Sequence, residues 1–133
     1  MRRATSDLYY ALFHRVCEAL VQPIGLLPES TAFVETYRTL YRIPDHAFVA
    51  QRCKEVRSHS FSEAIASFGQ QIVVMRTKRE DADYDPMKRF AISVVNNDLS
   101  TVASVIKGFG KTDPVEQARF AYFVSLKGRK LKE

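Results

Sequence analysis

Residues 65–79 read IASFGQQIVVMRTKR, and this stretch predicts the helix around which the rest of the chain is organised. Its apolar side chains recur at steps of three and four, which is the period of an amphipathic α-helix. They are Ile65, Phe68, Ile72 and Met75. One further step reaches Arg79, which we therefore expect on the inward side of the helix near its end. Because an inward charge costs free energy unless it meets an anion, Arg79 should either pair with a carboxylate such as Asp83 or belong to a binding site.

Two local signals bound this helix. Ser60-Phe61-Ser62-Glu63 has the capping-box pattern, a serine with a glutamate three residues later, and predicts a start near Phe61. Asp85-Pro86 is a turn signal. The residues between the apolar stripe and that turn, 79–85, read REDADYD. We expect them to form an acidic loop after a helix that ends near Lys78.

Five further segments carry helical patterns, so the sequence predicts an all-α fold, an up-and-down bundle of five to six helices. Their expected ranges are 3–21, 33–41, 45–56, 93–107 and 113–126. Ser93 should cap the fourth of these segments, and its inward side chains should be Val95, Leu99, Val102 and Ile106. Asp113-Pro114 gives the last segment a cap and a proline at its first position. Residues 87–92 show a short alternation that favours an extended segment.

The first of these segments carries an unusually wide apolar face, as expected of a helix central to a bundle. Two adjacent stripes form that face: Leu8, Leu12, Val16 and Ala19, beside Tyr9, Phe13, Cys17 and Leu20. The opposite edge presents four polar side chains at spacings of four, three and four, and these therefore share one side of the helix. They are Arg3, Asp7, Tyr10 and His14. This edge is either solvated or one wall of a polar cleft.

A second candidate site residue is His46, at the start of the predicted helix 45–56. It shares one side of that helix with Val49, Cys53 and Val56, so we expect it to face inward, close in sequence to Arg42. An inward histidine is either a core residue or a functional one. The positive end of the helix dipole should disfavour its charged form.

Composition and charge limit the function classes. The chain has 133 residues and a net charge of +5 with a pI near 9.4, which mildly favours acidic partners such as nucleic acid. Its length predicts one domain over residues 1–133, with a short basic tail at 127–133. Two isolated cysteines indicate a reducing cytoplasm, and no apolar run is long enough to span a membrane. With three histidines and no phosphate-binding or metal-binding motif, we expect neither a metal nor a cofactor.

Two stretches resemble proteins of the HEPN-domain family. Residues 3–14, RATSDLYYALFH, are similar to the first long helix of that family, and residues 78–85, KREDADYD, resemble the later arginine-containing loop of one bacterial branch. The order and spacing of the predicted helices fit the family over residues 2–127. The resemblance implies a bundle of four to five helices that is usually homodimeric. It also implies a link to RNA, because such domains act as metal-independent ribonucleases in toxin–antitoxin and phage-defence systems.

The resemblance also implies roles for individual residues. Active members carry an arginine followed after four to six residues by a histidine, whereas here Arg79 is followed by Tyr84, with Asp83 beside it. Tyrosine is a far weaker general base than histidine at neutral pH. Arg79 would then stabilise the charge of the transition state, and His46 or His14, from another helix, would transfer the proton. Arg42, Tyr10 and His14 complete the expected binding residues.

Two functional interpretations follow. In the first, the chain binds or cleaves RNA. In the second, it is an inactive dimeric scaffold that acts as an interaction module, with a nucleotidyltransferase-like antitoxin as a candidate partner. A homodimer is expected in both, because the chain offers many aromatic side chains of the kind that anchor interfaces. They are Tyr9, Tyr10, Phe13, Phe120, Tyr122 and Phe123.

Overall fold

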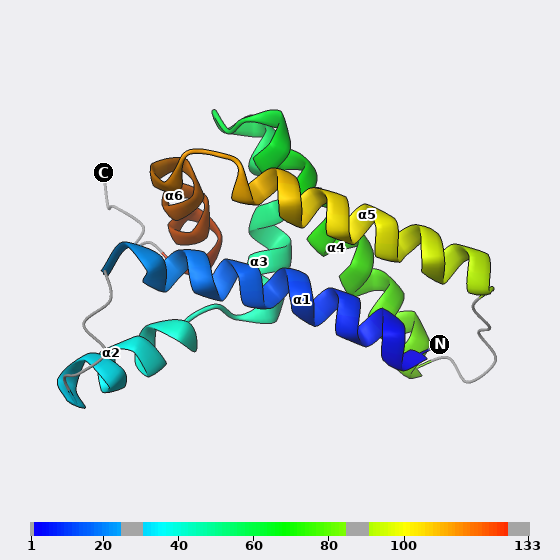
Figure 1. Cartoon of the computed structure of the whole chain (residues 1–133), viewed down its shortest axis with the longest axis horizontal. Helices are drawn as coiled ribbons and strands as arrows, with labels where there is room; N and C mark the ends of the chain where they lie inside the picture. The colour runs from blue at the N-terminus through cyan, green and yellow to red at the C-terminus, as the bar shows by residue number, and fades with distance from the viewer. Residues whose placement is uncertain (1, 25–30, 85–90, 128–133) are drawn as a thin grey trace, which may run out of the picture.

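The computed structural model describes residues 2–24, 31–84 and 91–127, and every regular element in these ranges is a helix (Figure 1). The α-helices are α1 (Arg2–Val21), α2 (Thr31–Tyr41), α3 (His46–Cys53), α4 (Glu63–Tyr84), α5 (Ile92–Gly110) and α6 (Pro114–Ser125). Two short 3₁₀ turns, η1 (Gln22–Ile24) and η2 (Val56–Ser58), follow α1 and α3. The arrangement confirms the predicted all-α bundle.

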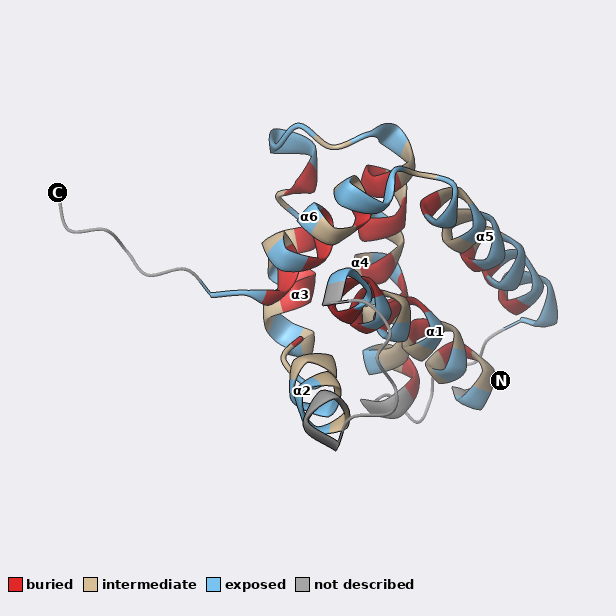
Figure 2. Cartoon of the chain, turned by 60° about the vertical axis from the view of Figure 1, so that its left-hand side comes forward, coloured by how far each residue is buried: buried red, intermediate tan, exposed pale blue. Residues whose placement is uncertain are grey.

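Helix α1 is the central element of the bundle. It contacts α2, α4, α5 and α6, and Figure 1 shows it crossing the molecule between α5 and α2. Both predicted apolar stripes face the interior, and of their eight side chains only Leu8 is not fully buried. Figure 2 shows the buried residues concentrated on the helix faces that turn towards the middle of the bundle. A helix with neighbours on several sides needs so wide an apolar face.

The core is closed by an aromatic cluster that joins α4, α5 and α6. The ring centroids of Phe68 and Phe109 are 4.4 Å apart, and that of Phe120 lies 5.9 Å from Phe68 and 5.8 Å from Phe109. Tyr9, Phe13 and Phe120 are all buried within the single chain. Their expected role as interface anchors is therefore wrong, because their apolar surface is already used inside the bundle.

Helix α4 is longer than predicted and replaces most of the expected acidic loop. It continues without a break from Glu63 to Tyr84. Neither Gly nor Pro occurs between residues 79 and 84, and Arg76 supports the extension with an ion pair to Glu80, 3.2 Å away on the next turn. Buried Ala82 continues the inward stripe past Arg79. The predicted turn at residues 85–86 lies outside the described residues.

The start of α4 also differs from the prediction. The cap is Ser62 and not Ser60: its hydroxyl oxygen accepts a hydrogen bond from the Ile65 amide at 3.5 Å. The Ser62 amide donates to Glu116 Oε1 on α6 at 2.6 Å. A tertiary carboxylate therefore takes the place that a capping-box glutamate would fill, and this displaces the helix start by two residues.

Helix α5 begins earlier and faces differently than predicted. It starts at Ile92 after Ala91, so Ser93 is not its cap, and Ile92 itself is helical and not extended. The rest of the expected extended segment, up to residue 90, lies outside the described residues. Val95 and Val102 are buried as predicted, but Leu99 is 54% exposed. Asp98 takes the inward position beside it, because Lys78 of α4 meets it there.

The last two helix boundaries to compare with the prediction are the end of α3 and the start of α6. Helix α3 stops at Cys53, three residues before its predicted end, and continues as the η2 turn. Helix α6 begins as predicted, with Pro114 in its first turn and the Asp113 side chain accepting from the Val115 amide at 2.7 Å.

Candidate functional site

The candidate site lies where the C-terminal part of α4 approaches the N-terminal half of α1. The guanidinium carbon of Arg79 is 4.8 Å from the ring centroid of Tyr10 and 5.4 Å from that of Tyr9. Arg79 is half-buried. A guanidinium over two tyrosine rings forms cation–π contacts that hold it in one orientation. The prediction that Arg79 turns towards the interior is confirmed.

His46 joins this cluster from the start of α3. Its Nδ1 atom lies 2.7 Å from the Tyr9 hydroxyl, and its ring stacks on Phe13 with a centroid distance of 3.8 Å and an interplanar angle of 19°. The Tyr10 ring stands edge-on to it at 5.9 Å. Buried Pro44 separates α2 from α3 and lets the chain turn so that α3 begins against α1.

The surroundings of His46 favour its neutral form. Burial lowers the pKa of His46 below its ordinary 6.5, the positive charges of Arg79 and Arg76 lower it further, and Asp45 opposes them. The imidazole is therefore uncharged at neutral pH. A neutral imidazole can accept a proton, and the positive charge of Arg79 beside it can hold an anion.

Tyr9 orients the His46 ring. Burial raises the pKa of Tyr9 to about 12, so its hydroxyl keeps its proton near neutrality. A hydroxyl can both donate and accept, and Tyr9 therefore fits either neutral tautomer of His46. When Nδ1 donates to the Tyr9 oxygen, the lone pair of Nε2 is available to act as a base.

His14 extends the cluster along α1 towards α2. Its Nδ1 atom lies 2.9 Å from the Tyr41 hydroxyl, and its ring is 6.2 Å from Tyr10. Tyr10 thus lies between two histidine rings. The other two members of the predicted polar edge, Arg3 and Asp7, stay exposed. Half of that edge is therefore part of the cluster, and the other half faces solvent.

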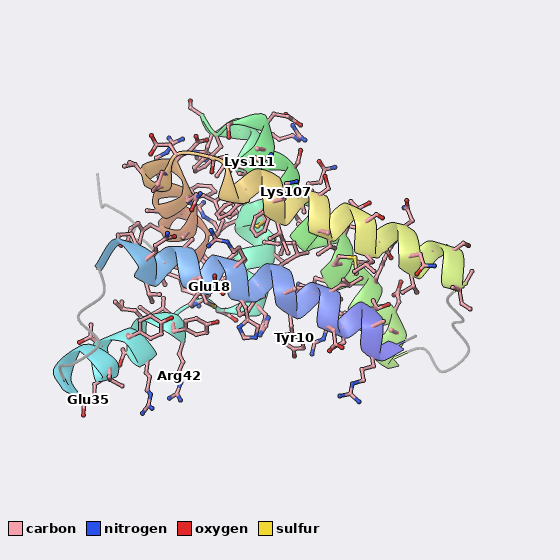
Figure 3. All side chains as sticks on the ribbon, in the orientation of Figure 1. Tyr10, Glu18, Glu35, Arg42, Lys107 and Lys111 are labelled. Atoms are coloured by element: carbon pink, nitrogen blue, oxygen red, sulfur yellow. The ribbon has the colours of Figure 1, made fainter. Side chains whose placement is uncertain are left out.

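Arg42 lies apart from Arg79, at the residue that follows α2. It is exposed and lines a groove of about 350 Å³ together with Tyr37, Arg38 and Tyr41. Figure 3 shows Tyr10 and Arg42 projecting on the same side of the molecule. Arg42 shares this groove with Tyr41, whose hydroxyl forms a hydrogen bond with His14 of the cluster.

Two predicted site residues can be placed only by their backbone. Asp83 and Tyr84 form the last turn of α4, on the helix that carries Arg79. Their side chains lie outside the described residues. The predicted pairing of Arg79 with Asp83 and the predicted role of Tyr84 both stay predictions.

Sequence reasoning missed Tyr9 and Phe13 as members of the cluster. The sequence pattern indicates only apolar packing and interface contacts for Tyr9 and Phe13. A tyrosine on a buried stripe nevertheless needs a partner for its hydroxyl, and this signal could have marked Tyr9. Arg76 contributes through its charge, one turn before Arg79, while it remains paired with Glu80.

Neither a metal-ligand group nor a membrane-spanning helix occurs among the described residues. No three side chains of His, Cys, Asp or Glu in those residues gather closely enough to hold a metal ion. None of the helices in the described part of the chain combines the length and apolarity needed to cross a membrane. Comparisons with protein-family models, with curated proteins and with solved structures find no match for this chain.

Proposed function

We propose that the chain is a HEPN-like protein of the toxin or defence type that cleaves RNA without a metal ion. The cluster of Arg79, His46, Tyr9, Tyr10 and His14 would be its site. The observation that carries the proposal is the meeting of His46 and Arg79 on the Tyr10 ring, with Nδ1 of His46 2.7 Å from the Tyr9 hydroxyl. These two groups come from α3 and α4, and α1 supplies the aromatic rings between which they lie.

The proposed reaction is attack of a ribose 2′-oxygen on the adjacent phosphate. Nε2 of His46 takes the proton of the 2′-hydroxyl as the new O2′–P bond forms. Arg79 stabilises the additional negative charge on the phosphate oxygens. The P–O5′ bond then breaks, and the departing 5′-oxygen takes a proton from His14 or from water. The products are a 2′,3′-cyclic phosphate and a free 5′-hydroxyl.

The proposal assigns proton transfer to His46 because Tyr84 stands where active HEPN proteins carry histidine. Tyrosine is the weaker base at neutral pH, whereas His46 is neutral and ordered by Tyr9. Tyr10 would support the base of the bound nucleotide, since aromatic rings stack on any nucleobase. The net charge of +5 adds a general attraction for the RNA backbone.

The pH dependence of cleavage tests this assignment. In the presence of EDTA, kcat/KM should rise with pH as His46 loses its proton, and the midpoint of this rise should lie below pH 6.5 because the pKa of His46 is lowered. Arg76→Gln removes one of the positive charges that disfavour the imidazolium form of His46. It should therefore move the rising limb of the kcat/KM profile to higher pH. His46→Gln should remove the limb together with the activity. Cleavage that requires an added divalent ion, or that survives in His46→Gln, would contradict the assignment.

A second candidate function, the dimeric interaction module, has one observation in its favour. Helix α5 exposes large apolar side chains: Ile92 is 64% and Leu99 54% exposed. Such residues are typical of a protein interface when they lie on one element. A homodimer and a nucleotidyltransferase-like antitoxin are both proposed occupants of this face.

The homodimer can be tested by light scattering at micromolar concentration, which should give about twice the chain mass of 15.2 kDa. Leu99→Lys should then shift the mass towards that of one chain, because it places a charge in the apolar face. A single-chain mass for the unmodified protein would contradict the dimer.

A further inference from the structure

The groove on α2 combines two stacked tyrosines with two arginines. The rings of Tyr37 and Tyr41 have centroids 5.9 Å apart and an interplanar angle of 24°, and both are half-exposed. Arg38 and Arg42 are exposed and complete the lining of the groove, whose volume is about 350 Å³. Aromatic faces that lie beside cationic side chains are the combination with which proteins bind unpaired nucleotides.

The arginines of the groove differ from four others that the structure describes. Arg15, Arg52, Arg57 and Arg76 each form an ion pair with a glutamate. Within the residues that the structure describes, Arg38 and Arg42 form no ion pair. Their charges are therefore available to an anion from outside. Arg38 lies on α2 and Arg42 directly follows it, so both arginines flank the two tyrosine rings.

Side-chain contacts connect the groove with the candidate site. The Tyr41 hydroxyl meets Nδ1 of His14 at 2.9 Å, and the two rings stack at 5.9 Å. The Tyr10 ring follows at 6.2 Å from His14, and Arg79 lies over Tyr10 at 4.8 Å. A series of rings therefore leads from α2 across α1 to Arg79, with arginines at both ends.

From this arrangement we infer that the α2 groove binds single-stranded RNA on one side of the nucleotide held at Arg79. The inference rests on the proposed function and adds to it the path of the strand. Bases would stack on Tyr37 and Tyr41, while Arg38 and Arg42 contact the flanking phosphates. A duplex would not fit this chemistry, because its base faces are covered by their neighbours in the stack. An acidic peptide would use the arginines but leave the tyrosine faces unexplained.

Binding of a fluorescein-labelled oligouridine tests the inference by fluorescence anisotropy. Its 2′-oxygens carry methyl groups, so it cannot be cleaved through them. Tyr37→Leu removes one stacking ring and should weaken binding roughly tenfold, and Tyr37→Phe should restore most of that loss because it returns the ring. The double variant Arg38→Ala with Arg42→Ala should lower the slope of log Kd against log salt by about 1.4, since each phosphate contact contributes about 0.7 on a single strand.

The matched control is the double variant Lys107→Ala with Lys111→Ala. It removes the same charge from the C-terminal end of α5, which Figure 3 shows on the opposite side of the molecule from Arg42. It should leave the salt slope near that of the unmodified protein. The inference is overturned if the groove variants bind as this control does, or if paired RNA binds as tightly as the single strand. Failure of the unmodified protein to bind RNA overturns it together with the proposed function. Groove-dependent binding of this probe, with no cleavage of the same oligouridine carrying free 2′-hydroxyls, would support the groove and reject the ribonuclease proposal alone.

Discussion

Arg79→Ala should lower the rate of RNA cleavage by about 10²- to 10³-fold, the usual loss when one group that stabilises transition-state charge is removed. The loss of stability should be small, on the order of 1 kcal/mol, because the side chain is only half-buried and a cation–π contact contributes on this scale. The measurements are single-turnover cleavage in EDTA and the midpoint of thermal unfolding, made on the same preparations.

Two further variants serve as a conservative substitution and as a control in this experiment. Arg79→Lys keeps the charge but loses the planar donor fork that matches a phosphate, so it should restore only part of the rate. Arg57→Ala removes an arginine that is exposed and bound to Glu63, and it should cleave as the unmodified protein does. A large loss of stability in Arg79→Ala, with no cleavage even by the unmodified protein, would reject the ribonuclease proposal. It would assign Arg79 a structural role instead.

Tyr84 can be tested beside Arg79. If the end of α4 belongs to the site, Tyr84→Phe should also weaken cleavage, whereas a purely structural helix end would lose only one hydroxyl group. Because the proposal assigns the base to His46, the effect of Tyr84→Phe should be smaller than that of His46→Gln.

The largest expected effect on stability comes from the ion pair between α4 and α5. Lys78 Nζ donates to both carboxylate oxygens of Asp98, at 2.7 and 2.9 Å, and the Asp98 side chain is only 6% exposed. Lys78→Met would leave this carboxylate buried without its cation. The free energy of unfolding should fall by about 3 kcal/mol, and the unfolding temperature by on the order of 10 °C.

A double-mutant cycle distinguishes the pair from general packing. Adding Asp98→Leu to Lys78→Met removes the stranded charge, and it should recover most of the lost stability because apolar side chains can fill the same space. The exposed pair of Arg57 and Glu63 is the matched control, and its disruption should cost much less because water replaces the lost contact. Equal losses in the two pairs, or a coupling energy below about 0.5 kcal/mol for Lys78 and Asp98, would contradict a buried ion pair.

Most of the fold could be predicted because its signals act within one or two helical turns. The apolar period of Ile65 to Met75, the Asp113 cap with Pro114, and the double stripe of α1 all depend on neighbours in the chain. The errors lie where a distant residue intervenes. Glu116 of α6 takes the Ser62 amide and displaces the start of α4, and Lys78 draws Asp98 inward so that Leu99 faces solvent.

The sequence predicted individual residues of the candidate site but not the contacts between them. The sequence placed Arg79 and His46 on inward sides and Tyr10 with His14 on one edge of a helix, since each follows from the helical period. It could not show that the Tyr9 hydroxyl meets His46, a residue 37 positions later, because that contact requires α3 to pack against α1. It assigned Tyr84 to a loop, whereas α4 continues through it.

By itself, then, the sequence determined that the chain is helical, where most helices begin or end, and that an arginine continues the buried stripe of α4. These features are local, and each is encoded by residues a few positions apart. Only the tertiary structure decided that this arginine lies over the rings of α1 beside a histidine from α3. Burial and the charges of Arg79 and Arg76 keep that histidine neutral. The pKa of a side chain depends on its burial and on the charges near it. For His46, both are determined by helices that are far apart in the sequence.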